Sequence, residues 1–230
     1  MAKTFSWSWS KLKNFRNCPK RSWHVDINKD VKETEGEALK WGHEVHAAMA
    51  ARIAKDKPLP PTMERYEPIP AKLASLRDTP GLAVKVEQKL AIDKDFKPVG
   101  FFDSSAWFRA VFDALAIGKV VGRAFDWKTG KMPDDGDAEY EQLALGASVL
   151  FAHYPDMQQV DTAFVWLGAD DETERTYHRD GMAPLWNKLW PEINVMTDAM
   201  RTTTYPPKPS GLCVRHCPVI SCPYYGKGTR

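Results

Sequence analysis

Two strand-like segments, each carrying a single aspartate among apolar residues, constrain the fold of this chain more than any other feature. The first is FRAVFDALAI (Phe108 to Ile117), and the second, VVGRAFDWKTG, follows after Gly118 and Lys119. Residues two apart on a strand face the same side, so Asp113 shares its face with Val111, Leu115 and Ile117. An ionisable group on an apolar face is costly unless another group pairs with it. We therefore expect a buried strand whose carboxylate has a partner.

A tight hairpin turn between the two segments would supply that partner. With Ile117 paired to Gly122, Asp113 falls opposite Asp126 on the second strand. Two carboxylates placed this close repel one another, and a shared proton or a bound cation relieves the repulsion. Lys128 comes two residues after Asp126 and projects to the same face. The sequence thus predicts two carboxylates and one ammonium group at a single place.

This set of groups suits the hydrolysis of a phosphodiester bond. Carboxylates hold Mg²⁺ or Mn²⁺ and leave positions for water and a phosphate oxygen. Such a cation lowers the pKa of its water and neutralises charge that grows on the phosphate, while a nearby lysine can orient the water. The alternative is a surface hairpin with an ion pair worth less than about 1 kcal/mol. The apolar neighbours of Asp113 favour the active-site interpretation.

A strong helix pattern covers EGEALKWGHEVHAAMAARIAK, from Glu35 to Lys55. Its apolar face is expected to include Leu39, Gly42, His46, Met49 and Ile53, which recur at steps of three or four. A single histidine on such a face is usually a packed core residue. Gly42, which leaves space one turn earlier, makes an enclosed functional site an equally good interpretation of His46.

The remaining patterns alternate between strand and helix. We expect a proline-rich connector from Asp56 to Gly81 with one short helix around Ala71 to Arg77, then a strand in LAVKVEQKLAI. After the hairpin come a helix in DAEYEQLALGASVLFAHYP, a strand in VDTAFVWLGA, and one or two closing helices in APLWNKLWPEINVMTDAMR. Strands flanked by helices predict an α/β (α+β) domain around a mixed central β-sheet.

Composition bounds the class of protein. The 230 residues are 43% hydrophobic and carry a net charge of +2, which suits one globular domain with a real core. No apolar run approaches the roughly 20 residues of a membrane helix, and MAKTFSWSWSKLKNF lacks the apolar stretch of a secretory signal. We therefore expect a cytoplasmic protein with no membrane partner.

The N-terminal segment combines basic and aromatic residues. Ser10 is expected to cap a short helix that runs to about Arg21. This segment carries five cations and no acid: Lys11, Lys13, Arg16, Lys20 and Arg21. Aromatic rings and cations together can bind a nucleic-acid strand through stacking and phosphate contacts. The alternative is a set of core aromatics beside a solvated basic face.

The order of these motifs resembles the PD-(D/E)XK nuclease superfamily, in particular its RecB and Cas4-like branch. Asp113 followed by DWKTG is similar to the core motif D…DxKTG, and GHEVH (Gly42 to His46) is similar to the helix motif Gly-x-x-x-His. YEQLALGA resembles the glutamine motif, although Gly146 stands where a tyrosine is frequent, and SWSKLKNFRNCP resembles the usual opening of the branch.

The resemblance implies both an architecture and a set of site residues. It implies a single nuclease domain over residues 1–230, with a restriction-endonuclease-like core at about 35–205. His46, Asp113 and Asp126 would bind one or two Mg²⁺ or Mn²⁺ ions. Lys128 would be the catalytic lysine and Gln142 a helper close to the metal or the DNA.

Four cysteines form a separate set, with Cys18 far from the three in GLCVRHCPVISCPYYG. The late three are Cys213, Cys217 and Cys222, and three of the four cysteines precede a proline, as ferredoxin cluster ligands do. The set resembles the ligands of the [4Fe–4S] cluster of the RecB and Cas4-like branch. It would clamp residues of about 8–24 to 211–225. A structural zinc ion and unligated buried thiols are the alternatives.

These features together predict a metal-dependent DNA nuclease. We expect an exonuclease that acts on DNA ends or single strands in recombination, repair or phage DNA metabolism, in a bacterial or phage-infected cell. The chain has no phosphate-binding loop of a helicase, so any recombination or helicase function would come from a partner. The alternatives are a non-catalytic DNA-binding module and a CRISPR-adaptation-like accessory subunit that acts through a protein partner. The combination of His46, Asp113, Asp126 and Lys128 favours the enzyme.

Overall fold

The computed structural model describes residues 5–33, 36–133 and 140–227. Contacts divide the chain into two compact units, which are Gly36–Trp186 and a discontinuous unit of Met1–Glu35 with Asn187–Arg230. The first unit carries the β-sheet, and the second carries all four cysteines. The single nuclease domain expected over the whole chain stays a prediction.

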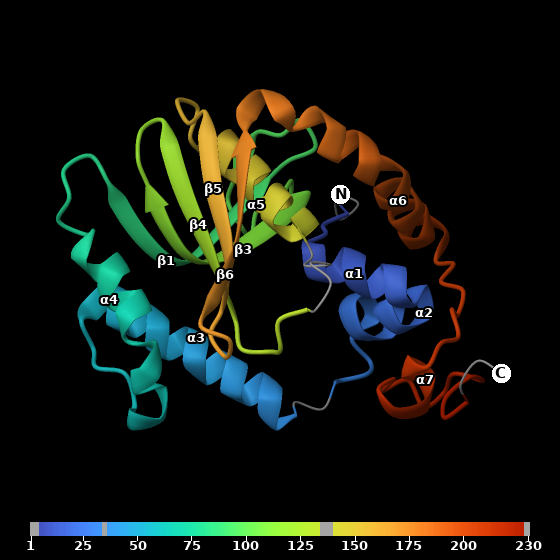
Figure 1. The fold of residues 1–230 in the computed structure, drawn as a ribbon. Coiled ribbons are helices and arrows are strands. Elements are labelled where there is room, and N and C mark those ends of the chain that lie inside the picture. The colour runs from blue at the N-terminus through green and yellow to red at the C-terminus, as the bar shows by residue number, and fades with distance from the viewer. Residues whose placement is uncertain (1–4, 34–35, 134–139, 228–230) are drawn as a thin grey trace. The chain divides into compact units, whose positions relative to one another are not determined.

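The sheet has six strands in the order β2-β1-β3-β4-β5-β6. Their bounds are β1 Ala83–Ile92, β2 Pro98–Val99, β3 Phe108–Ile117, β4 Val121–Lys128, β5 Gln159–Trp166 and β6 Asp171–His178. β4 and β5 are parallel, and all other neighbouring strands are antiparallel. The expected mixed central sheet flanked by helices is therefore confirmed (Figure 1).

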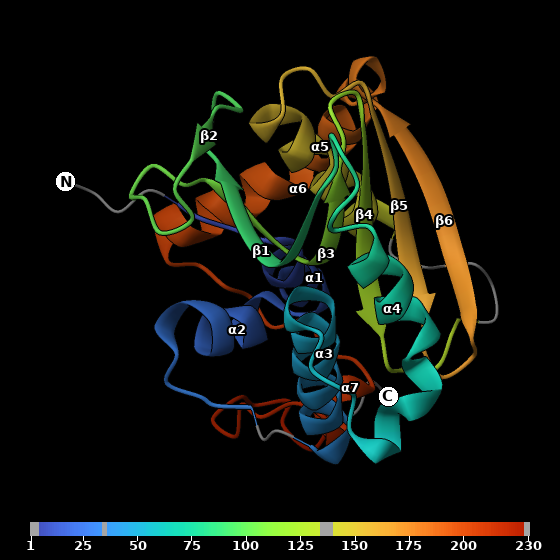
Figure 2. The ribbon, with the colours of Figure 1, turned by 90° about the vertical axis from the view of Figure 1, so that its left-hand side faces the viewer.

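Helices cover both faces of this sheet (Figures 1 and 2). The helices of this unit are α3 Glu37–Lys55, the 3₁₀ helix η2 Pro61–Tyr66, α4 Pro68–Ser75, α5 Tyr140–His153 and the 3₁₀ helix η3 Arg179–Gly181. On β5, Val165 belongs to the core cluster that includes residues of α3 and α4, whereas Phe164 and Trp166 belong to a cluster with Leu143 of α5. Because neighbouring strand residues face opposite sides, α5 lies on the other face from α3 and α4.

The buried side of α3 differs from the expected one. Val45, Met49 and Ile53 are fully buried, but Leu39 is 48% exposed. The buried stripe begins only at Val45, and residues 37–44 are exposed or half-buried. The assignment of Leu39 to the core face is therefore wrong. His46 is half-buried beside this stripe.

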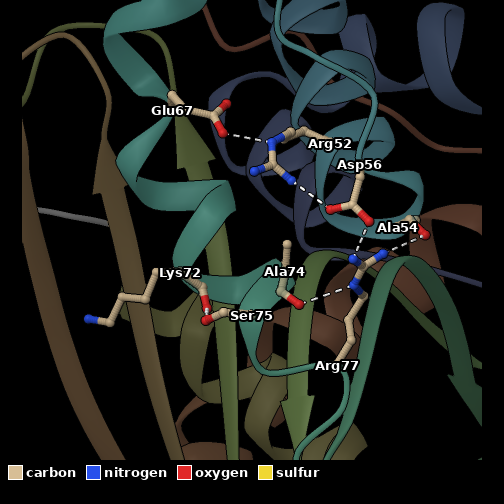
Figure 3. A network of polar contacts seen from close by, with 8 residues as sticks. All are labelled: Arg52, Ala54, Asp56, Glu67, Lys72, Ala74, Ser75 and Arg77. Carbon is tan, nitrogen blue, oxygen red and sulfur yellow. Dashed lines mark hydrogen bonds and ion pairs between the residues drawn. The ribbon is translucent and has the colours of Figure 1, made fainter.

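Arginine side chains fasten the C-terminal end of α3 to the α4 region (Figure 3). Arg52 donates to Glu67 at 2.7 Å and to Asp56 at 2.9 Å. Arg77 pairs with Asp56 and also donates to two backbone carbonyls, at 3.1 Å and 3.2 Å. The bond to the Ala54 carbonyl satisfies a group that the C-terminal end of α3 leaves without an intrahelical partner. The network therefore links the C-terminal end of α3 to the residues on either side of α4.

Two further elements differ from the sequence-based expectation. β6 was not expected, because DETERTYH forms an edge strand with no buried side chain and so shows no apolar alternation. The short helix expected around Ala71 to Arg77 is α4, which begins and ends earlier. The closing segment, for which one or two helices are expected, is one helix, α6 Ala183–Thr202, with Pro191 inside it. No helix among the described residues is long and apolar enough to cross a membrane.

The discontinuous unit is mainly helical. It contains α1 Trp9–Asn17, α2 Pro19–Ser22, a π-helical turn Trp23–Asn28, most of α6, and α7 Leu212–Arg215. The N-cap of α1 is Ser8, whose side chain accepts from the Lys11 amide. The expectation of Ser10 at this place is wrong by one half turn, because α1 begins before it. Arg16 of α1 makes a bidentate ion pair with Glu192 of α6.

Candidate active site

The β3–β4 hairpin has the expected register. Ile117 pairs with Gly122, and the paired positions continue to Ala114 opposite Phe125. Beyond them, the Asp113 carboxylate takes the place of backbone pairing, since its Oδ2 accepts from the Trp127 amide at 2.7 Å. Asp113 is thus held between the two strands at the point where their pairing stops.

His46 of α3 reaches the same place. Its Nε2 donates to the Trp127 carbonyl oxygen at 3.1 Å, and its Nδ1 lies 3.1 Å from Oδ1 of Asp113. A carbonyl oxygen can only accept, so the proton of a neutral His46 belongs on Nε2. This bond leaves the lone pair of Nδ1 on the side of Asp113, which is the state in which histidine binds a metal ion.

The charges around His46 favour an added positive charge. Burial lowers the pKa of His46, but the hydrogen bond and charge of Asp113, and then the charge of Asp126, raise it, and the net pKa lies above its usual value. A proton supplies this positive charge at low pH. A divalent cation would satisfy the same acids.

α3 can approach the strands because residue 42 is glycine. A Cβ atom at Gly42 would lie 3.3 Å from the Thr129 hydroxyl oxygen, just after β4. This distance is tighter than an ordinary van der Waals contact. The expected space one turn before His46 is therefore occupied by the Thr129 side chain.

A second group joins Asp126, Lys128 and Gln142. Lys128 Nζ lies 2.7 Å from Oδ2 of Asp126 and donates to Oε1 of Gln142 at 3.2 Å. The amide nitrogen of Gln142 in turn donates to Oδ1 of Asp126 at 2.5 Å. The Lys128 ammonium also lies 4.5 Å from the centre of the Phe164 ring. The three polar side chains close a ring that fixes the ammonium beside the carboxylate.

Burial perturbs the acid of this ring. It raises the pKa of Asp126 to about 6, with the charge of Lys128 opposing the rise and the charge of Asp113 adding to it. A raised carboxylate pKa next to a lysine and a further acid is typical of an active site. Asp126 would lose its proton more readily once a cation was bound nearby.

Glu87 of β1 is the acid that the sequence reasoning missed. Its carboxylate, the Asp113 carboxylate and a ring nitrogen of His46 offer ligand atoms that all lie within 4.8 Å of one another. In the sequence Glu87 alternates with Lys85 and Lys89, so it resembles part of a solvated face. The sequence holds no local signal for it; Glu87 and Asp113 come together because they lie between the pairs Val86–Ala114 and Gln88–Phe112 of β1 and β3.

Comparisons with known proteins identify the family. A family model of the PD-(D/E)XK nuclease superfamily matches residues 6–222. The chain belongs to this superfamily. A solved structure of a protein from Eubacterium rectale, named as a candidate exonuclease, is 14% identical, with a TM-score of 0.57 over 92% of this chain and 86% of that one. The structure of the protein SSO0001 is 11% identical, with a TM-score of 0.46 over 97% and 88%. The sequence matches no curated protein.

Superfamily membership implies a divalent metal ion, and the residues at the site fit one. The donors are one imidazole nitrogen, whose ring is fixed by the Trp127 carbonyl, and the carboxylates of Asp113 and Glu87. Nitrogen and carboxylate oxygen suit Mn²⁺, and carboxylate oxygen suits Mg²⁺. Asp126 is not in this group of three, and its assignment as a ligand stays a prediction.

The packing of α5, the helix that carries Gln142, explains the glycine at position 146, where the resemblance would favour a tyrosine. A Cβ atom at Gly146 of α5 would lie 3.1 Å from the Phe112 ring on β3. The Phe112 ring therefore takes the space that a side chain at position 146 would need. Gln142, one turn earlier, still reaches Asp126 and Lys128.

All four cysteines line one small cavity in the discontinuous unit, and none is in a disulfide. The Lys208 amide donates to the Cys18 sulfur, and the Ser210 amide donates to the Cys213 sulfur, both at 3.4 Å. Burial, together with the neighbouring Cys213 and Cys18, raises the pKa of Cys217. The prediction that these four residues form one ligand set is untested, but the fold does bring them together.

The predicted DNA-binding cations lie in the same unit, and several already have partners. Arg16 pairs with Glu192 and lies 5.1 Å from the Trp9 ring centre, while Arg21 pairs with Glu33. Lys11 donates to a backbone carbonyl, and Lys20 lines the cysteine cavity. Lys13 is not free of contacts either. The role of these residues in binding DNA stays a prediction.

Proposed function

We propose that this protein is a divalent-metal-dependent DNA exonuclease of the RecB and Cas4-like branch. The observation that carries the proposal is the arrangement along β4. The Trp127 backbone binds both His46 and Asp113, and the residues on either side of it, Asp126 and Lys128, form the ring with Gln142. A metal-binding pair and a fixed ammonium group therefore meet within three consecutive residues.

The side chains divide the work of hydrolysis. A bound divalent ion would supply positive charge at the scissile phosphate and activate a water molecule. His46 and Asp113 would hold it. Lys128, kept in place by Asp126 and Gln142, would stabilise charge on a phosphate oxygen or orient the attacking water.

Gln142 is a positioning residue in this proposal. Its amide nitrogen donates to a carboxylate and its amide oxygen accepts from an ammonium, so only one orientation of the amide satisfies both neighbours. This restricts the rotamers of Asp126 and Lys128 before substrate binds. A preorganised site loses less free energy in ordering its groups during the reaction.

The substrate would be DNA with a free end or a single strand, in recombination, repair or phage DNA metabolism. The E. rectale protein, a candidate exonuclease by name, supports the mode of action only by analogy of fold. A recombination or helicase partner would present the strand.

The test is digestion of end-labelled single- and double-stranded DNA with Mg²⁺, Mn²⁺ or EDTA. Lys128→Ala should lower the rate at least about 100-fold, and Lys119→Ala, in the exposed hairpin turn, should keep the wild-type rate. The labelled end gives the polarity. Metal-dependent cleavage at full rate by Lys128→Ala would refute the assignment. DNA binding without cleavage in any metal would instead support the non-catalytic or accessory alternative.

The cysteine cavity supports a [4Fe–4S] cluster as a structural clamp in the same proposal. Four sulfurs around a zinc ion at about 2.3 Å would lie only about 3.8 Å from one another. Among the described residues, no three cysteine sulfurs all lie within 4.8 Å of one another, so the thiols are spread more widely than one zinc ion requires. Backbone N–H groups aimed at Cys18 and Cys213 suit cluster sulfurs.

Metal and sulfide analysis of anaerobically purified protein separates the alternatives. A [4Fe–4S] cluster gives about four irons and four sulfides per chain, and Cys217→Ser should lose them. One zinc ion without sulfide would contradict the cluster.

A further inference from the structure

We infer that Glu87 is a third protein ligand of the divalent ion that His46 and Asp113 would hold. This inference rests on the proposed function, because it assigns a role at the same site. No motif in the sequence singles out Glu87. Its role follows from the way in which β1 and β3 bend together.

In β1 and β3, the regular alternation of side chains between the two faces of the sheet is interrupted at one point. Val86 and Ala114 are paired across β1 and β3, and both pack in the cluster of α3. Phe112, two residues before Ala114, instead lies against Gly146 of α5 on the other face. Regular alternation would keep residues 112 and 114 on the same face. The break in alternation therefore falls between them, at Asp113.

β1 breaks at the matching position. The ladder pairs Val86 with Ala114 and Gln88 with Phe112, but it contains no pair between Glu87 and Asp113. Glu87 has a φ of 48°, a left-handed conformation that residues with a Cβ atom rarely adopt within a strand. Both acids thus stand at a shared kink, and their carboxylates point to His46 instead of to a sheet face.

The neighbours of Glu87 leave its carboxylate unpaired. Lys85 donates to the Tyr154 hydroxyl at 3.2 Å, and Lys89 lies 6.0 Å from the centre of the Phe101 ring. Within residues 5–33, 36–133 and 140–227, the Glu87 carboxylate has no hydrogen-bond or ion-pair partner. A surface glutamate flanked by two lysines would ordinarily pair with one of them. This one faces an imidazole and a second carboxylate.

Glu87 adds a third protein ligand for a divalent cation. With Glu87 the site offers one nitrogen and two carboxylates, which is a common protein share for Mn²⁺ or Mg²⁺ that keep water and phosphate oxygens on the other positions. Glu87 is exposed, whereas Asp113 and His46 are half-buried. The third ligand therefore comes from the solvent side, where the ion and the phosphate must enter.

The test measures binding of Mn²⁺ alone, by the electron paramagnetic resonance of the free ion, to the intact chain. Glu87→Gln should raise the Kd at least about 10-fold, because even residues that only orient the ligands change metal affinity by about 10- to 100-fold. The matched control is Glu172→Gln, an exposed glutamate on edge strand β6, which should keep the wild-type Kd. The unfolding midpoint in EDTA checks that each variant is folded.

A shorter acid separates coordination from general negative charge. Glu87→Asp keeps the charge but withdraws the carboxylate by one methylene, so a ligand role predicts a clear rise in Kd. A wild-type Kd for both Glu87 variants, with binding lost in Asp113→Asn, would overturn the inference and leave the proposed nuclease intact. Failure of the wild type to bind Mn²⁺ would overturn both.

Discussion

Asp113 offers the sharpest test of the site, because its carboxylate accepts from the backbone of β4 and would also hold the proposed divalent ion. Its Oδ2 accepts from the Trp127 amide at 2.7 Å, where β3 no longer pairs with β4. Asp113→Asn keeps an oxygen for this amide, but Asp113→Ala leaves the N–H without a partner. An unsatisfied N–H costs about 1–3 kcal/mol, so the alanine variant should be less stable than the asparagine variant by that amount.

Comparison with the wild type brings in the second contact. Asp113→Asn loses a charge-assisted bond but also removes repulsion from Glu87 and Asp126, so in EDTA it should lie within about 1 kcal/mol of the wild type. Added Mn²⁺ should stabilise only the wild type, by about 2.7 kcal/mol at 100 times the Kd. Each kcal/mol corresponds to about 2–4 °C in Tm for a chain of this size.

The assay is thermal unfolding of the three proteins in EDTA and in Mn²⁺. Equal Tm values for Asp113→Ala and Asp113→Asn in EDTA would refute the claim that the carboxylate replaces the backbone ladder. Stabilisation of Asp113→Asn by Mn²⁺ to the wild-type extent would refute its role in holding the ion.

Three further predictions concern the same unit. The pKa of Asp126 is raised to about 6, and that of His46 is also raised. The folded metal-free protein therefore binds more protons than the unfolded chain near pH 5. Its free energy of unfolding in EDTA should fall as the pH rises from about 4 through 7. The same protons compete with the cation, so Mn²⁺ affinity measured by titration calorimetry should rise over that range, and Asp126→Asn should flatten both curves. Gln142→Leu should slow DNA digestion at least about 10-fold while leaving the Mn²⁺ Kd unchanged, since it releases Lys128 without touching the ion; a changed Kd would place Gln142 nearer the metal. Arg77→Ala, which removes an exposed ion pair from the network of Figure 3, should lower the free energy of unfolding in urea by only about 1 kcal/mol, and a loss above about 3 kcal/mol would show that this network is worth far more than its exposure implies.

The hairpin could be predicted because its information is local. A glycine turn and a strand period of two fix which residues face one another, so the pairing of Ile117 with Gly122 could be predicted. The helix that presents His46 was also readable from its spacing. Its buried stripe begins only at Val45, because sequence alone does not show where α3 first meets the sheet.

Glu87 could not be predicted from its local pattern. The strand VKVEQKL alternates well enough to place Glu87 with two lysines on a solvated face. Only the φ of 48° at this residue, which the sequence does not signal with a glycine, turns the carboxylate towards His46. β6 was missed for a related reason, since an exposed edge strand needs no apolar alternation.

The cysteine cavity also has a consequence for the order in which the two units can fold during synthesis. Cys18 leaves the ribosome about 195 residues before Cys213, which corresponds to about 10–40 s at ordinary rates of bacterial and eukaryotic translation. During that time the sheet unit, Gly36–Trp186, emerges as one continuous stretch and can fold, while Cys18 remains a lone thiol. The cysteine cavity can form only after the final cysteine has been made, so a truncated chain would carry the β3–β4 hairpin without a complete cysteine cavity.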